Sequence, residues 1–432
     1  MQIERNRYIE QLKSKRNNGR IKIITGIRRC GKSYLLNTLY QDYLLSIGVE
    51  KQHIIAMALD DDVNMKYRNP IELGTYLRQA MTPDNNYYIM IDEIQKVVSI
   101  DNPYLPANSG EKIGFVDVLL GLNKLPNVDI YVTGSNSKML SSDIVTEFRD
   151  RGDEIKVYPL TYNEFYKAFT ADKRFAWREY VTYGGMPYAL YLQTHEEKAK
   201  YLEDLFTLTY IKDVVERNHI RGKMETLDGI LNVLASSVGS LTNPTRLANT
   251  LNTTRHIQIK SDTVSAYIDY FIDAFILSKA FRYDVKGRAY INTPLKYYFT
   301  DSGLRNARLN FRQQEENHIM ENIIFNELKA RGFSVDVGTV EYNYQNERGE
   351  NKRSQLEVDF VVNKPNKRFY IQSALTVADE NKRMQEVNSL RRIDDSYTKM
   401  VIVKDNILPW TDEQGVKYIN VEDFLLNDID TF

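Results

Sequence analysis

Cysteine is almost absent from this sequence, and so are long apolar runs. The one cysteine, Cys30, has no second cysteine with which to form an intramolecular disulfide. No stretch reaches the roughly 18 apolar residues that a membrane-spanning helix needs. Residues 1–20 contain acids and lack the apolar core of an export signal. We therefore expect a cytoplasmic protein that makes no membrane contact.

A large excess of charge of either sign is also missing. The 432 residues include 57 basic and 58 acidic side chains, which gives a formal net charge of −1. Any surface that binds nucleic acid must therefore be a local patch. Hydrophobic residues make up 42% and charged residues 27%, as in globular proteins, and the length predicts two to four domains.

Five short apolar segments alternate with helix-like stretches in residues 1–165. This alternation is typical of a parallel sheet that is covered by helices on both faces. We therefore predict an α/β fold for this part of the chain. The five segments are 21–26, 53–62, 87–94, 128–137 and 153–160.

Three further patterns follow this first domain. Residues 166–225 are helical throughout and predict a lid. Residues 226–312 contain three short helical stretches and then a two-stranded ribbon, the element order of a winged helix. Residues 313–432 mix helices with strands and predict a second, smaller α/β domain.

The stretch GIRRCGKS has the G-x(4)-G-K-S spacing of a phosphate-binding loop, and it stands between a strand and a helix as that motif requires. Glycines allow the backbone amides to approach a phosphate, Lys32 reaches the β and γ phosphates, and the Ser33 hydroxyl ligates Mg²⁺. Arg28 and Arg29 either favour phosphate electrostatically or are solvated charges. We interpret Cys30 as a passive small residue. The predicted ATP-binding residues are Gly26, Ile27, Arg28, Arg29, Cys30, Gly31, Lys32, Ser33 and Tyr34.

An acid pair ends the predicted strand YYIMIDEI, sixty residues after Lys32. We expect Asp92 to hold Mg²⁺ and Glu93 to act as the general base on the attacking water. The next strand ends in TGSNS, where Ser135 and Asn136 are candidates for sensing the γ-phosphate. That signal is weak by itself, because Gly-Ser-Asn turns end many strands.

Two arginines precede the fifth segment. Arg149 and Arg151, in EFRDRGDEI, are candidates for an arginine finger that reaches the γ-phosphate of a neighbouring subunit, which implies a homo-oligomer. The alternative is that both pair with nearby acids.

These motifs resemble a large prokaryotic family of AAA-type ATPases that join an N-terminal ATPase domain to a C-terminal domain of unknown function. The likeness covers nearly the whole chain and includes, in order, TGSNSKML, RGDEIKVYPLTYNEF, YGGMPYAL, YIKDVVERNHIR, KYYFTDSGLRN and EVDFVV. The resemblance implies an ATPase with a helical lid, a winged helix and a tail that is similar to restriction nucleases.

The tail departs from the nuclease pattern at the residues that would perform catalysis. Glu321 or Glu327 is the candidate helix acid and Asp359 the strand acid, with Glu357 two positions away. The E-x-K position, however, reads Gln372 and Ala374, which removes a metal-binding charge and the lysine beside the water. We predict a degenerate nuclease fold that does not cut DNA.

The winged-helix segment favours neither DNA nor protein as a partner. Four basic side chains could contact phosphates, but the expected recognition helix carries Asp262, Asp269 and Asp273 and has no Arg or Lys before Lys279. The four are Arg246, Arg255, His256 and Lys260.

Our leading hypothesis is a Mg²⁺-dependent ATPase whose nucleotide state repositions the C-terminal domains against a DNA or protein partner. The alternatives are a nucleotide-gated DNA-binding protein with little turnover and an active DNA nuclease.

Overall fold

The computed structural model divides the chain into two compact units. It describes residues 3–106, 108–134, 148, 151–220, 224–254, 258–312, 315–345 and 348–432. Unit 1 comprises Met1–Tyr158 with Asp273–Phe275, and unit 2 comprises Pro159–Ile272 with Ile276–Phe432. None of the described helices is long and apolar enough to cross a membrane.

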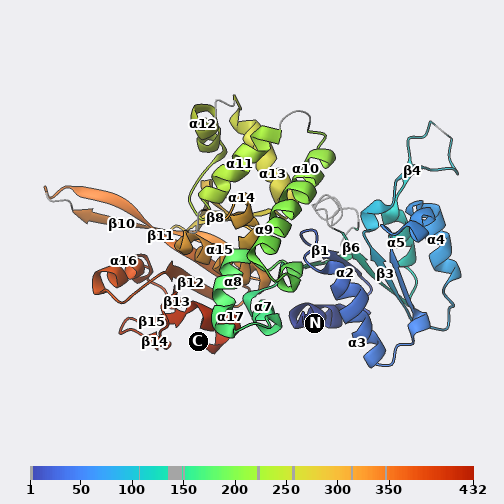
Figure 1. The fold of residues 1–432 in the computed structure, drawn as a ribbon, viewed down its shortest axis with the longest axis horizontal. Helices are drawn as coiled ribbons and strands as arrows, with labels where there is room; N and C mark the ends of the chain where they lie inside the picture. Colours follow the sequence, from blue (N-terminus) through green and yellow to red (C-terminus); the bar gives the residue numbers. More distant parts are fainter. Residues whose placement is uncertain are drawn as a thin grey trace. The chain divides into compact units, whose positions relative to one another are not determined.

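Unit 1 is built on a five-stranded sheet (Figure 1). Its strands are β1 (Ile21–Thr25), β2 (Ile54–Ala58), β3 (Tyr87–Asp92), β6 (Val128–Thr133) and β7 (Gly152–Lys156), in the order β2-β3-β6-β1-β7. All neighbouring strands are parallel. β1 and β3 are buried over their whole length, as expected for central strands that are covered on both faces. The prediction of an α/β fold with a parallel sheet is confirmed.

One helix precedes β1, and the others lie in the connections that lead from β1 to β6. They are α1 (Asn6–Lys15), α2 (Lys32–Tyr34), α3 (Gln41–Ser46), α4 (Pro70–Gln79) and α5 (Phe115–Leu122), and a small ribbon is made by β4 (Ile100–Asp101) and β5 (Lys112–Ile113). A π-helical segment, Leu35–Tyr40, joins α2 to α3, so the chain is helical from Lys32 to Ser46. At α4 the Asn69 side chain accepts a hydrogen bond from the backbone N–H of Ile71, and proline occupies the first helical position, which is a favourable helix start.

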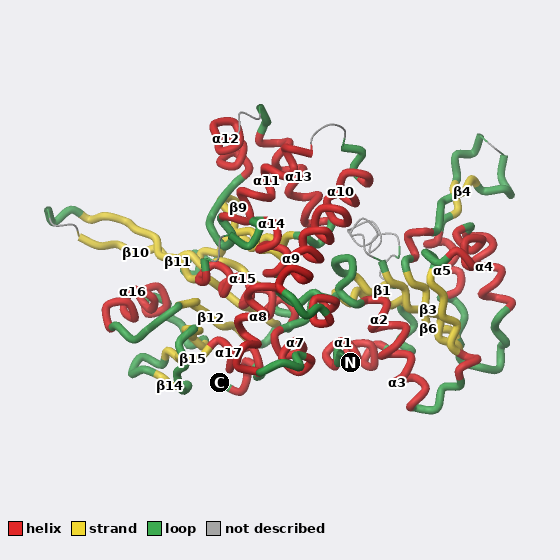
Figure 2. The backbone as a smooth tube through the Cα atoms, viewed as in Figure 1, coloured by secondary structure: helices red, strands yellow, loops and turns green. Residues whose placement is uncertain are grey.

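The rest of the chain contains eleven described α-helices. They are α7 (Tyr162–Ala168), α8 (Ala176–Tyr183), α9 (His195–Asp204), α10 (Lys212–Arg217), α11 (Met224–Ser236), α12 (Pro244–Thr254), α13 (Ser261–Asp273), α14 (Ser302–Arg308), α15 (Glu316–Ala330), α16 (Glu380–Arg391) and α17 (Val421–Leu426). α7 and α9 each begin with a capping box, in which a threonine and a glutamate three residues later satisfy each other's backbone N–H groups. α11, α12 and α13 lie together as a helical cluster (Figure 2).

Unit 2 is organised by an eight-stranded mixed sheet. Its strands are β8 (Leu277–Asp284), β9 (Ala289–Phe299), β10 (Ser334–Gln345), β11 (Asn351–Lys364), β12 (Lys367–Ala374), β13 (Thr398–Val403), β14 (Trp410–Thr411) and β15 (Val416–Asn420), in the order β14-β15-β13-β12-β11-β10-β8-β9. The outer parts of β10 and β11 extend from the body of this sheet as a two-stranded arm (Figure 1).

One strand pairing in unit 2 crosses a border that was expected from the sequence. β8 and β9, expected as the ribbon of residues 226–312, belong to the same sheet as the strands of 313–432, because Val337 of β10 pairs in parallel with Arg282 of β8. A hydrogen-bonded ladder therefore continues across the expected border at 312. The four-part division itself stays a prediction.

A glycine turn that the sequence signals between two helices is held by an aspartate far along the chain. The Asp301 carboxylate accepts hydrogen bonds from the backbone N–H of Gly185, at 2.6 Å, and of Leu304, at 3.0 Å. Asp301 is also the N-cap of α14. One buried carboxylate therefore joins the YGGMP segment to the TDSG segment, two of the motifs on which the family resemblance depends.

Candidate nucleotide site

The loop of residues 26–33 follows β1 and precedes α2, as the motif requires. Gly26 has φ of 140°, and a Cβ built on it would lie 2.0 Å from the carbonyl oxygen of Val157. Gly31 has φ of 98° and stands directly before the helix. Side chains larger than hydrogen are strained or excluded at these points, so the glycines are required by the path of the backbone.

Lys32 is the buried cation of this loop. Its side chain turns back over the loop, and Nζ donates hydrogen bonds to the carbonyl oxygens of Gly26, at 3.0 Å, and Ile27, at 3.1 Å. Residue 32 is only 4% exposed. These two neutral acceptors are weaker partners for an ammonium than phosphate oxygens would be, so a bound phosphate can compete for the same donors.

The other loop residues differ in their exposure. Arg28, Arg29 and Ser33 are exposed, and Tyr34 is half-buried. Cys30 is fully buried, and its Sγ–H lies 3.4 Å from the carbonyl oxygen of Val157. A thiol in that position is inaccessible to a substrate, which favours the interpretation of Cys30 as a packing residue.

The acid pair lies where β3 ends. Asp92 is the last residue of the strand and is buried, whereas Glu93 follows with φ of 54°. The Thr133 hydroxyl donates to the Asp92 carboxylate and accepts from the backbone N–H of Glu93, at 3.1 Å from that nitrogen. The Gln95 side-chain amide donates to the Glu93 carboxylate. This network orients both carboxylates.

The environment of Glu93 favours its protonated form more than water does. Burial is the largest effect and raises the pKa of Glu93 above its usual value, and the negative charge of Asp92 acts in the same direction. Lys32 and Arg28 oppose the rise. Two cations of the phosphate loop therefore act electrostatically on the carboxylate at the end of β3.

Strand order explains how residues sixty positions apart share one site. β6 lies between β1 and β3, and in the parallel registers Ile24 of β1 faces Thr133 of β6 while Ile91 of β3 faces Val132. The three strands thus end at the same edge of the sheet. In open α/β sheets the ligand site lies at the carboxyl ends of the strands.

Two supporting residues were not predicted from the sequence. Thr133 is one. It ends the strand that follows the acid pair in the sequence, and this position was the signal from which its role could have been predicted. Arg5 is the other: Nη1 donates to the carbonyl oxygen of Cys30 at 3.0 Å, and Nη2 donates to that of Tyr158 at 2.7 Å. Arg5 is 2% exposed. No sequence pattern connects an N-terminal arginine with two carbonyls so far along the chain.

We expect Arg5→Ala to lower the free energy of unfolding of unit 1 by about 3 kcal/mol, because two carbonyls lose a charged donor. ATP affinity should fall as well, since the Cys30 carbonyl belongs to the phosphate loop. Urea unfolding and ATP titration check both. Lys13→Ala is the control, because Lys13 of the same N-terminal region is partly exposed, pairs with the exposed Glu10 and lies 4.7 Å from the centroid of the Tyr43 ring, contacts that are worth less than two buried charged hydrogen bonds. Equal stability of the two variants would show that Arg5 is dispensable.

Some predicted site residues cannot be placed. Ser135, Asn136 and Arg149 lie outside the described residues, as do Arg255 and His256 of the winged-helix segment.

Arg151 is described and exposed, and it directly precedes β7. Its carbonyl oxygen accepts a hydrogen bond from Ile21 N–H at 2.8 Å, so it lies where β1 and β7 begin, at the opposite edge of the sheet from the loop. Five strand residues, each rising about 3.3 Å, separate the two edges. Arg151 cannot reach the phosphate loop of its own chain, and only a neighbouring subunit could use it as a finger.

The candidate nuclease residues of the tail are brought together only in part. Glu321 of α15 and Glu357 and Asp359 of β11 all approach the ammonium of Lys296, which the sequence did not single out. Glu327 instead pairs with Arg331 at 2.6 Å. The rest of this region is formed by Gln372, Ser373 and Ala374. The Gln372 Oε1 accepts a hydrogen bond from the Asp359 N–H at 3.3 Å, and Ala374 is part of an apolar cluster.

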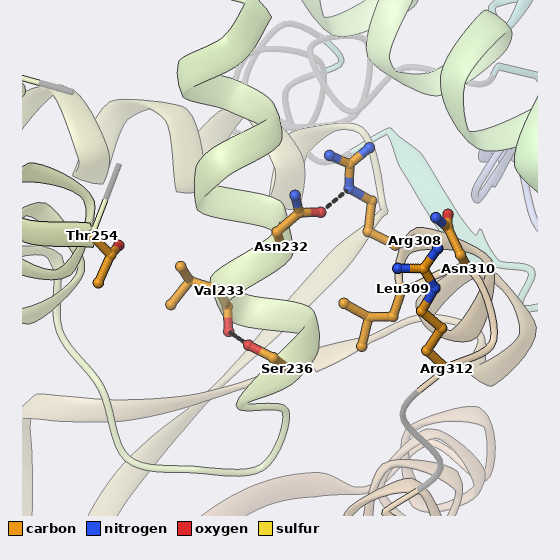
Figure 3. A pocket seen from close by; sticks show the side chains of 8 residues that line it. All are labelled: Asn232, Val233, Ser236, Thr254, Arg308, Leu309, Asn310 and Arg312. Carbon is orange, nitrogen blue, oxygen red and sulfur yellow. Dashed lines mark hydrogen bonds between the residues drawn. The ribbon is translucent and has the colours of Figure 1, made fainter. Parts of the chain in front are cut away.

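A pocket of about 350 Å³ lies among the helices of unit 2. Figure 3 shows the Arg308 guanidinium turned toward Asn232 of α11, with Asn310 and Arg312 nearby. Arg308 Nε donates to the Asn232 side chain at 2.6 Å, and Nη2 lies 2.8 Å from the Asp228 carboxylate. The charge of Arg308 is therefore compensated within the protein.

Comparison with known proteins agrees with this geometry. Residues 18–166 match a family described as an AAA domain, and residues 174–315 match a domain of unknown function. An uncharacterised protein of Haemophilus influenzae is 30% identical over 430 residues, which cover 98% of both chains. An uncharacterised protein of Methanocaldococcus jannaschii is 30% identical over 424 residues, which cover 94% of this chain and 85% of the other.

Among solved structures, the Walker-type ATPase of Pyrococcus abyssi is similar with a TM-score of 0.47 and 13% identity, over 71% of this chain and 96% of the other. The phosphate loop and the matched AAA domain define a P-loop protein of the nucleotide-binding class. This chain belongs to the prokaryotic family of AAA-type P-loop ATPases that carry a C-terminal domain of unknown function.

Proposed function

We propose that unit 1 binds ATP with Mg²⁺ and hydrolyses it at the carboxyl edge of its sheet. The observation that carries this proposal is geometric: the phosphate loop after β1 and the acid pair at the end of β3 lie at the same end of the parallel sheet, with only β6 between the two strands. The oxygen donors of Ser33 and Asp92 are of the kind that Mg²⁺ prefers. When bound, the ion would neutralise charge on the β and γ phosphates.

Each residue of the site then has a defined task. Lys32 exchanges its two carbonyl partners for phosphate oxygens, and the loop amides bind the β-phosphate. Glu93 accepts a proton from the attacking water. Thr133, which bonds to the backbone of Glu93 and to the carboxylate of Asp92, holds these two residues side by side. The raised pKa of Glu93 makes it a stronger base than an exposed glutamate.

We further propose that the nucleotide state of unit 1 repositions the C-terminal elements against a partner. α13 is acidic at Asp262 and Asp269, and the Asp269 carboxylate lies 3.9 Å from Lys279 Nζ, so this helix offers no free cation stripe to a phosphate backbone. That charge pattern favours a protein partner, and the basic residues Arg246 and Lys260 keep DNA as the second candidate.

Phosphate release measured with and without duplex DNA tests the proposal. If the partner is a protein, we expect basal ATP turnover in Mg²⁺, and duplex DNA should change that rate by less than about twofold. A Glu93→Gln chain that retains ATP should then capture the protein partner. Binding of ATP and DNA without any turnover would instead favour the nucleotide-gated DNA-binding alternative. Location in the cytoplasm stays a prediction.

A further inference from the structure

Three acidic side chains of unit 2 surround one lysine. Glu321 comes from α15, and Glu357 and Asp359 come from β11; these three are called the carboxylate triad. Lys296 of β9 lies 2.8 Å from Glu321, 2.7 Å from Glu357 and 3.9 Å from Asp359, measured from Nζ to carboxylate oxygen. A single ammonium from β9 thus contacts side chains from two other elements, α15 and β11.

Most of the cluster is buried, and it carries more negative than positive charge. The Lys296 side chain is 4% exposed, those of Glu321 and Asp359 are 7% and 11% exposed, and that of Glu357 is 36% exposed. Three carboxylates face one ammonium, so a proton or a second positive charge is needed for balance. Burial first, and the charge of Glu321 second, raise the pKa of Asp359 well above its usual value, which agrees with such a deficit.

Polar groups around the triad hold two of its carboxylates in place. The Tyr298 hydroxyl donates to Glu321 at 2.7 Å, and the backbone N–H of Ser373 donates to Asp359 at 2.8 Å. The Ser373 hydroxyl is itself buried and has no hydrogen-bond partner among the residues described. Convergent carboxylates with a nearby unused hydroxyl form an oxygen donor set of the type that divalent cations select.

We propose that the Lys296 ammonium occupies the position of a divalent cation in a three-carboxylate site, and that removing this side chain converts the triad into a Mn²⁺ or Mg²⁺ site. In the native chain the lysine blocks metal binding. In the part of the chain that the structure describes, no group of three or more acidic, His or Cys side chains is arranged to hold a metal ion, so the triad as it stands around Lys296 is not a preformed metal site. Lys296 also connects β9 to α15 and β11, and so joins the expected winged-helix ribbon to the tail.

The test compares Mn²⁺ binding by the nucleotide-free full chain and its Lys296→Met variant. Both carry Asp92→Asn to weaken the nucleotide-site metal. The number of bound ions is obtained from the decrease of the electron paramagnetic resonance signal of free Mn²⁺ during titration with protein. We expect one more Mn²⁺ per chain in the Lys296→Met variant than in its parent, and we expect the additional ion to be lost in Lys296→Met/Asp359→Asn.

Thermal unfolding keeps the proposal testable if Lys296→Met is poorly folded without metal. Mn²⁺ at 1 mM, a concentration we choose for the assay, should raise the melting temperature of the variant by about 4 °C or more and leave that of its parent unchanged. No additional Mn²⁺ and no shift would overturn the proposal. So would cleavage of supercoiled DNA by the wild type that disappears in both Lys296→Met and Asp359→Ala, because the lysine would then be a catalytic residue beside a metal.

Discussion

Replacing Lys32 with alanine should weaken ATP binding by at least about 100-fold, since the β and γ phosphates lose two charge-assisted hydrogen bonds. The ammonium is already desolvated, and its present partners are two carbonyls of its own loop. Titration with a fluorescent ATP analogue measures the change.

The control for this substitution is Lys51→Ala, which removes an exposed lysine of the same unit. Its affinity should equal that of the wild type. Melting curves of both variants separate lost binding from lost folding. If a folded Lys32→Ala chain binds the analogue as tightly as Lys51→Ala does, the loop is not the phosphate site.

Glu93→Gln should reduce turnover by about 10² to 10⁴-fold and leave ATP affinity nearly unchanged. The amide keeps the size of the side chain and can still contact Gln95, but it cannot accept a proton from water. Because burial raises the pKa of Glu93, wild-type turnover should decline as pH falls through that raised pKa, and the residual rate of the variant should lack this decline.

Glu10→Gln provides the comparison for the Glu93 variant, because Glu10 is an exposed acid of unit 1 that pairs only with Lys13 among its described neighbours. Its turnover should match the wild type at every pH. Turnover of Glu93→Gln within a few-fold of Glu10→Gln would assign Glu93 a structural role.

The parallel sheet was predictable because its signals are local. β-branched runs, their separation by helical stretches and the glycine spacing of residues 26–33 each depend on neighbouring residues, and the structure has strands within all five predicted segments except that β7 begins one residue early, at Gly152. The position of the acid pair, sixty residues after Lys32, was predictable for a related reason. The parallel strands β1 and β3 end on the same side of the sheet, so a carboxylate at the end of β3 lies near the loop that follows β1.

Residues that act through long-range contacts could not be predicted in this way. In the sequence Lys296 is an ordinary polar residue of a strand. Only the pairing of β8 with β10 joins the β8–β9 ribbon to the sheet that contains Asp359, and so brings Lys296 to Glu321 and Asp359. The same pairing explains why a border at 312 looked natural in the sequence: the ribbon is antiparallel and local, whereas its parallel bond to β10 joins residues more than fifty positions apart.

The nucleotide retained by purified Glu93→Gln after incubation with ATP and Mg²⁺ tests the central claim most directly. Nucleotide is extracted from the protein and separated chromatographically, with the wild type and Lys32→Ala treated in parallel. The account predicts intact ATP on Glu93→Gln, ADP on the wild type and no nucleotide on Lys32→Ala. ADP on Glu93→Gln in the same amount and at the same rate as on the wild type would contradict it.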